Sequence, residues 1–254
     1  MGVGELRRGV AELNALRIIG CAIASVLLAS GAVGQVAATA APNPVAGVQD
    51  TLAQRMQACF LCHGQQGRST NVGYFPRIAG KPAGYLYNQL QNFKVGRRHN
   101  SAMNHLVEHM SDDYLRDIAR YFSELDLPYP PAQALTIDAD QVRIAKALVF
   151  DGIPQRQIPA CVSCHGQQMA GKLPAMPGLL TLPSDYLVGQ LGAWRAGTRK
   201  ARAPDCMGEV AKRLSPEEVG AVVRWLSAQT LPVGTHPEAA SATSLPITCG
   251  SDQR

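Results

Sequence analysis

Two short stretches of the chain each place a pair of cysteines two residues apart, with a histidine directly after the pair. They read Cys59-Phe60-Leu61-Cys62-His63 and Cys161-Val162-Ser163-Cys164-His165. This pattern is typical of c-type haem attachment, in which each thiol forms a thioether with one vinyl group of the porphyrin. The histidine then supplies a neutral imidazole nitrogen as proximal ligand of the iron. The sequence therefore predicts two covalently bound haem c groups, attached through Cys59, Cys62, Cys161 and Cys164, with His63 and His165 as axial ligands.

Two other kinds of site also use paired cysteines. A structural zinc site usually brings two Cys-x-x-Cys units to one metal. Here each unit has its own histidine, and the two units lie about a hundred residues apart. A thioredoxin-like dithiol needs a strand–helix–strand context, which this sequence does not indicate. Haem attachment is therefore the preferred interpretation.

An electron carrier needs a second axial ligand on each iron, and a methionine sulfur raises the potential relative to a second histidine. Met103 and Met207 each lie eight residues before a serine, Ser111 or Ser215, that begins a predicted helix. We therefore predict Met103 and Met207 as the distal ligands. Met110 is expected to be a packing residue.

Other side chains compete for the distal positions. Three histidines of the first half, His99, His105 and His109, are interpreted as surface residues. Cys206 stands beside Met207 and would supply a thiolate, although adjacent residues seldom point the same way in an extended loop. In an oxidising compartment a disulfide between Cys206 and Cys249 is expected, and two unpaired thiols are the alternative.

The elements that position these residues occur twice, in segments offset by 101 residues. Helices are predicted over 83–95 and 184–196, and Gly96 and Gly197 stand where each would stop. Helices beginning after Ser111 and Ser215 are expected to bury apolar stripes against the porphyrins. Those stripes are Leu115, Ile118, Ala119 and Phe122, and Val219, Val222, Val223 and Leu226.

Leading helices are predicted over 48–59 and 139–150, each ahead of its cysteines. Pro76 and Pro177 either offer a carbonyl to the proximal histidine or are plain turn residues. Four basic residues that follow the middle helices either pair with haem propionates or an acidic partner or form a solvated loop, and the loop is preferred. They are Arg97, Arg98, Arg199 and Lys200.

The resulting organisation is all-α, with two tandem cytochrome c-type domains related by an internal repeat. Residues 1–40 are predicted to be a signal peptide, because a basic start and a short apolar run precede the small-residue site Ala38-Thr39-Ala40. Residues 41–130 and 131–230 are the two domains, joined by a stiff proline-rich linker. Residues 231–254 are expected to be an irregular tail. Export to the periplasm follows, and an uncleaved anchor is the less favoured alternative.

The chain resembles the dihaem cytochrome c4 family over nearly all of the sequence that follows the predicted signal peptide. The resemblance rests on the two Cys-x-x-Cys-His-Gly stretches, the Tyr-Leu-x-x-Gln-Leu helices, and Met103 and Met207. It implies a periplasmic electron carrier, often membrane-associated, that passes electrons from a respiratory donor towards a terminal oxidase. An electron-accepting subunit of a dehydrogenase is the alternative, and an enzyme such as a thiosulfate dehydrogenase is a weaker one. The formal net charge of +5 gives no support for nucleic-acid binding.

Overall fold

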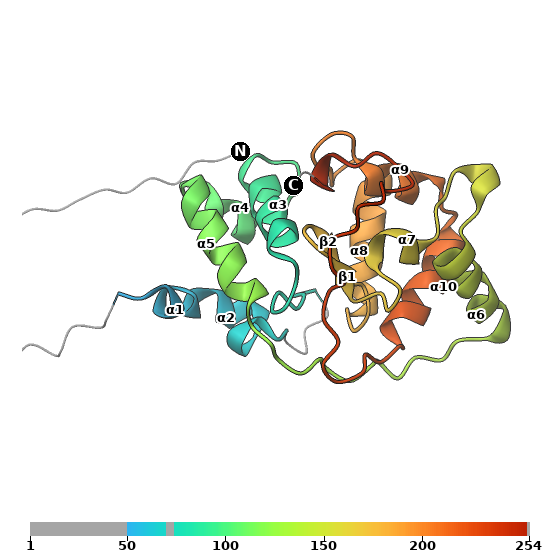
Figure 1. The fold of residues 1–254 in the computed structure, drawn as a ribbon, viewed down its shortest axis with the longest axis horizontal. Helices are drawn as coiled ribbons and strands as arrows, with labels where there is room; N and C mark the ends of the chain where they lie inside the picture. Colours follow the sequence, from blue (N-terminus) through green and yellow to red (C-terminus); the bar gives the residue numbers. More distant parts are fainter. Residues whose placement is uncertain (1–49, 70–73, 253–254) are drawn as a thin grey trace, which may run out of the picture. The chain divides into compact units, whose positions relative to one another are not determined.

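The computed structural model describes residues 50–69 and 74–252, and the predicted signal peptide lies outside them. Nearly all regular elements of the described chain are helices, joined by irregular segments (Figure 1). Its one sheet is the short antiparallel pair β1 (Gly171–Lys172) and β2 (Met176–Pro177). The all-α prediction is therefore confirmed.

The first half follows the predicted order. Its α-helices are α1 (Leu52–Arg55), α2 (Gln57–His63), α3 (Ala83–Lys94), α4 (Ser101–Val107) and α5 (Asp112–Ser123). A break at Met56 divides the single leading helix predicted from the sequence into α1 and α2. The short turn η1 (Gln65–Gly67) follows the first histidine.

The second half repeats the pattern with additions. Its α-helices are α6 (Ala139–Lys146), α7 (Cys161–His165), α8 (Ser184–Arg195), α9 (Cys206–Arg213) and α10 (Pro216–Ser227). The predicted leading helix ends in a π-turn, η2 (Ala147–Asp151), and the short turn η3 (Pro154–Arg156) comes before the cysteines. Another short turn, η4 (Gly250–Asp252), lies in the tail.

The helix boundaries follow local chemistry. The side chain of Ser111 accepts a hydrogen bond from Tyr114 N and caps α5. Ser215 and Glu218 form a complete capping box at the start of α10. Gly96 and Gly197 have φ of +72° and +73° just past the ends of α3 and α8, a conformation that favours glycine. The predicted ends of these helices are confirmed.

Each half has its own buried apolar cluster. The first lies around α3 and α5 and includes Leu115 and Phe122, with Cys59 and Met103 packed against it. The second lies around α6, α8 and α10 and includes Val222 and Leu226. All eight stripe residues predicted from the sequence are buried. Two separate cores agree with the predicted tandem domains, whose boundaries remain a prediction.

The tail is irregular, as expected, but it is hydrogen-bonded to the second half. Glu238 donates its backbone N–H to Gly171 O and accepts from Leu173 N. Among the described residues, no helix combines the length and apolar character needed to cross a bilayer.

Candidate functional site

The second predicted haem site is a cavity in the second half. Cys161, Cys164 and His165 come from α7, and Met207 comes from α9, and all four line the same cavity. The remaining lining is largely aliphatic and includes Leu148 and Leu226. The predicted attachment and ligand residues are therefore brought together around an apolar space suited to a porphyrin.

His165 is held in one orientation by a backbone carbonyl. Its Nδ1 lies 2.7 Å from Pro177 O, and only 5% of the residue is exposed. Burial lowers the pKa of His165, so the imidazole stays neutral, and the carbonyl places the proton on Nδ1. Nε2 is then left with a lone pair for a metal.

The proximal histidine of the first predicted site, on α2, is held in the same way. His63 Nδ1 lies 2.9 Å from Pro76 O, and burial again lowers the pKa of His63. The interpretation that the carbonyls of Pro76 and Pro177 accept a hydrogen bond from the histidines is thus confirmed over the plain-turn alternative. Cys62 is exposed, whereas Cys164 of the second half is only partly exposed.

Both predicted distal methionines lie on helices, whereas the segment of Cys206 and Met207 was expected to be an extended loop. Met103 is in the first turn of α4, where its N–H donates to Asn100 Oδ1 at 3.1 Å. Met207 is the second residue of α9, whose N-cap is Asp205. Capping side chains therefore fix both positions. The loop prediction was wrong because the Asp205 cap was not recognised.

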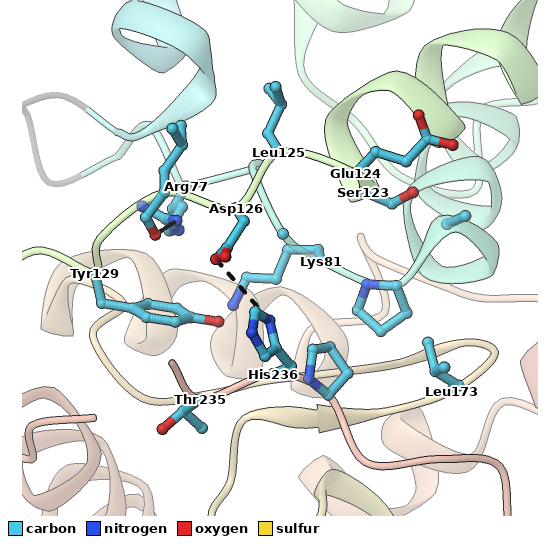
Figure 2. A pocket seen from close by; sticks show the side chains of 15 residues that line it. Arg77, Lys81, Ser123, Glu124, Leu125, Asp126, Tyr129, Leu173, Thr235 and His236 are labelled. Atoms are coloured by element: carbon cyan, nitrogen blue, oxygen red, sulfur yellow. Dashed lines mark hydrogen bonds and ion pairs between the residues drawn. The ribbon is translucent and has the colours of Figure 1, made fainter. Parts of the chain in front are cut away.

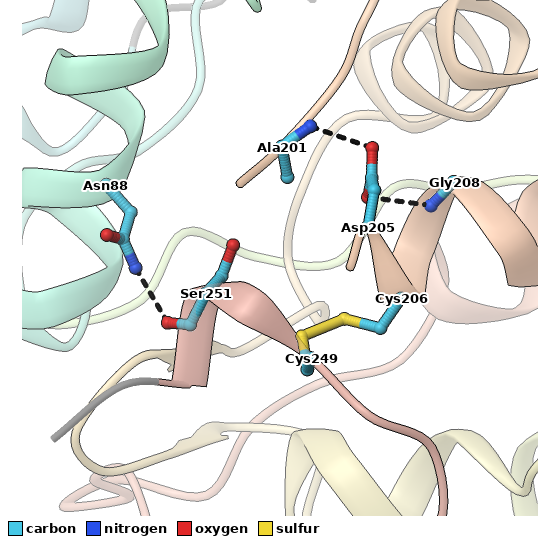
Figure 3. Close-up of a disulfide and its surroundings, with 7 residues drawn as sticks. All are labelled: Asn88, Ala201, Asp205, Cys206, Gly208, Cys249 and Ser251. Carbon is cyan, nitrogen blue, oxygen red and sulfur yellow. Dashed lines mark hydrogen bonds between the residues drawn. A yellow bond between two sulfur atoms is a disulfide. The ribbon is translucent and has the colours of Figure 1, made fainter. Parts of the chain in front are cut away.

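The competing ligands are removed from the candidate positions. Cys206 is bonded to Cys249 with an S–S distance of 2.02 Å, which confirms the expected disulfide and leaves no thiol for a metal (Figure 3). His105 and His109 have side chains 84% and 93% exposed and lie beside Glu108, and His99 is exposed as well. Among the described residues, no group of three or more His, Cys, Asp or Glu side chains gathers to form a conventional metal site.

Two arginines lie buried between the halves, in contrast to the solvated loop preferred from the sequence. Arg98 Nη2 donates to Tyr186 Oη and Gln190 Oε1, both at 2.9 Å. Arg199 Nη1 donates to Gln190 Oε1 at 2.6 Å. The loop prediction was wrong for this pair because each helix end turns its arginine into the opposite half. Lys200 is exposed, and Arg97 is partly exposed.

Among the described residues, the cluster of Arg98, Arg199 and Trp194 lacks a carboxylate and contains a buried hydrogen-bond donor without a partner. No ion pair joins Arg98 or Arg199 to a carboxylate in the described part of the chain, although both are more than nine-tenths buried. A buried cation without a counter-charge is costly. Trp194, whose ring lies 3.7 Å from the Arg199 guanidinium carbon, has a buried Nε1 without a partner there. Haem propionates would supply the missing charge and acceptors, so these residues fit the cofactor.

A second pocket lies between the linker, the tail and Lys81 (Figure 2). Lys81 Nζ donates to Gly178 O at 2.9 Å, and only 4% of the residue is exposed. Burial, with a smaller contribution from the nearby Arg77 charge, lowers the pKa of Lys81 to about 7. Arg77 donates to Leu127 O and Pro128 O and thereby ties the linker to the first half.

No model of a protein family matches the chain. A protein named thiosulfate dehydrogenase electron acceptor from Stutzerimonas stutzeri (strain A1501) is 35% identical over 170 residues, covering 67% of this chain and 78% of that protein. A cytochrome c4 from Thiocapsa roseopersicina is 32% identical over 194 residues, covering 76% of this chain and 95% of that protein. This chain belongs to the dihaem cytochrome c4 family.

Solved structures agree with the family. A reduced recombinant cytochrome c4 from Pseudomonas stutzeri matches with a TM-score of 0.60 and 28% identity, over 70% of this chain and 96% of that one. A thiosulfate dehydrogenase from Marichromatium purpuratum matches with a TM-score of 0.59 and 31% identity, over 66% of this chain. This chain spans only 36% of that larger chain. A solved cytochrome c4 and a part of a solved thiosulfate dehydrogenase therefore have a fold similar to that of this chain.

Two residues of the tail, Leu245 and Ile247, line the second cavity of this cytochrome but were not predicted from the sequence. No local pattern marks them, because they lie far along an irregular segment. The buried pair Arg98 and Arg199 did carry a signal: the two residues are related by the same offset as the repeated helices. The 101-residue repeat therefore predicts equivalent surroundings for the two arginines.

Proposed function

We propose that the protein is a periplasmic dihaem cytochrome that carries electrons one at a time between protein partners. The observation that carries this proposal is the second cavity, where His165 and Met207 approach one apolar space from different helices. In the proposed holoprotein, haem iron supplies the one-electron couple. His63 with Met103, and His165 with Met207, would fill both axial positions of each iron.

The surrounding residues suit an electron carrier rather than an enzyme. The apolar lining excludes water from the second cavity, and Pro177 O fixes the orientation of His165. Arg98 and Arg199 would hold the propionates and offset their charge. With both axial positions filled by side chains, no position is left for a substrate.

We further propose that the electron donor is a thiosulfate dehydrogenase. Two relatives support this assignment, at 35% and 33% identity, and both are named as electron acceptors of that enzyme. Passage of the electrons onwards to a terminal oxidase is the proposed exit. The alternative that this chain itself oxidises thiosulfate is less favoured, because Cys206 is occupied in a disulfide.

A rapid-mixing experiment tests both parts of the proposal. The purified oxidised protein, shown by haem assay and mass to carry two covalent haems, is mixed with thiosulfate alone and with thiosulfate plus a catalytic amount of a thiosulfate dehydrogenase. Reduction of both haems only when the enzyme is present is expected. Rapid reduction by thiosulfate alone would favour the enzyme alternative, and no reduction in either mixture would reject this donor.

A further inference from the structure

The tail of the second half runs past its candidate haem cavity. We call residues 235–252 the strap. Near its start, Glu238 pairs with the β1 region through two backbone hydrogen bonds, and its carboxylate accepts from Gln167 N just after the Cys-x-x-Cys-His stretch. Further on, Leu245 and Ile247 line the cavity that Met207 also lines. The strap therefore covers part of the predicted haem site.

The far end of the strap is fixed beside Met207. Cys249 is bonded to Cys206, the residue that precedes Met207 (Figure 3). Gly250 N donates to Pro204 O at 2.8 Å, and a Cβ at Gly250 would lie 2.2 Å from Ala203 O. The backbone of the strap thus lies directly against the loop that leads into α9.

That loop is also held from its inner side. Asp205 accepts a hydrogen bond from Gly208 N at 2.9 Å and another from Ala201 N at 2.7 Å. Its carboxylate therefore ties the loop to the first turn of α9. The disulfide and the Asp205 cap together fix the backbone on both sides of Met207.

Among the described residues of the first half, no disulfide holds the residue that precedes Met103. Met103 and Met207 stand at equivalent distances from their helix caps Ser111 and Ser215, so Ala102 occupies the position that corresponds to Cys206. The start of α4 relies instead on side-chain caps such as Asn100. The two candidate sites are thus built differently on their distal sides.

We infer that the strap, locked by the Cys206–Cys249 disulfide, is a positioning device that keeps Met207 in the second cavity and shields its distal side from exogenous ligands. This inference rests on the proposed ligation of the second iron by His165 and Met207. Leu245 and Ile247 supply the apolar cover, and the disulfide prevents the start of α9 from moving outwards. Cys206 and Cys249 are positioning residues and take no part in electron transfer.

The test compares the wild-type holoprotein with C249S and with the matched control Ala102→Ser on the first half. The readouts are the weak sulfur-to-iron charge-transfer band of the oxidised protein and carbon monoxide binding to the reduced protein. Wild type and A102S are expected to retain the full band and exclude carbon monoxide. C249S is expected to lose about half of the band and to bind one carbon monoxide per chain.

Two further measurements keep the proposal testable if the C249S variant does not fold or does not bind haem. If C249S does not assemble, the folded wild-type protein is treated with a dithiol, alkylated and reoxidised, and the same two readouts are taken. Limited proteolysis, which does not depend on the haem signal, should cut the strap faster once the disulfide is opened. A wild-type protein with only half of the expected band would refute the proposed ligation. A full band in wild type that survives opening of the disulfide would refute the strap's role.

Discussion

Arg98 and Arg199 both donate a hydrogen bond of 3.1 Å to the same atom, Gln89 Oε1, although the two arginines come from different halves of the chain. Gln190 accepts from both as well. Each guanidinium also lies over the aromatic ring at the end of its own helix, Phe93 or Trp194. The repeated halves therefore meet through a shared polar centre that carries two positive charges and lacks a carboxylate partner among the described residues.

We expect Arg98→Gln and Arg199→Gln each to lower a haem potential, because a nearby positive charge stabilises the reduced iron. We expect each variant to lower the haem potential by on the order of tens of millivolts, because a buried charge is only weakly screened by solvent. A spectroscopic redox titration measures the effect. Arg97→Gln is the control, because Arg97 is partly exposed and bonds to Asn92. Equal shifts in all three variants would contradict a specific role for the buried pair.

Replacement of the predicted distal ligands should act on one haem at a time. Met103→His or Met207→His should lower the potential of one haem by on the order of 0.1 V, since histidine favours the oxidised iron more than methionine sulfur does. Met110→Leu serves as the control, because Met110 packs against the first core. The assignment fails if the methionine variants leave both potentials unchanged.

We expect the potential of the second haem to depend on pH through the charge of Lys81. Burial is the main reason that the pKa of His165 is lowered, and the positive charge of Lys81 lowers it further, so the two groups are electrostatically coupled. The pKa of Lys81 is about 7, so the side chain is charged below pH 7 and neutral above it. The potential should therefore fall as pH rises through this range.

The matched variant for this prediction is Lys81→Met, which keeps the buried aliphatic volume but has no charge. Its second-haem potential should be lower than that of wild type well below pH 7, and the difference should shrink above it. Titrations at several pH values measure both proteins. The neighbouring groups Arg77, Asp126 and His236 are unchanged in this comparison. A pH dependence that persists in the variant would assign the effect to other groups.

The capping box of α10 should matter more for stability than the simpler cap of α5. Ser215→Ala is expected to cost about 1–2 kcal/mol in the free energy of unfolding, because it removes the partly buried 3.1 Å hydrogen bond from Glu218 N to Ser215 Oγ. Ser111→Ala removes a longer and exposed cap hydrogen bond, 3.3 Å from Tyr114 N to Ser111 Oγ, and should cost less. Denaturant unfolding of the two holoproteins measures the difference. An equal or larger cost at Ser111 would contradict this ranking.

Much of this architecture was predictable because local chemistry and the repeat agree. Gly96 and Gly197 mark helix ends, Ser111 and Ser215 mark helix starts, and the apolar stripes between them are buried. The segment of Cys206 and Met207 was expected to be extended, because the capping role of Asp205 at the start of α9 was not recognised. The burial of Arg98 depends on contacts 88 and 92 residues away, which no local pattern reveals.

We expect the disulfide also to set an order of events during maturation. Cys249 lies 43 residues after Cys206 and closes the strap over the cavity that contains Cys161 and Cys164. These two thiols must still be free and reachable when the porphyrin arrives. Attachment at the second site would therefore have to come before oxidation of Cys206 and Cys249. Formation of this disulfide would then be a late step, which closes the second site after its haem has been attached.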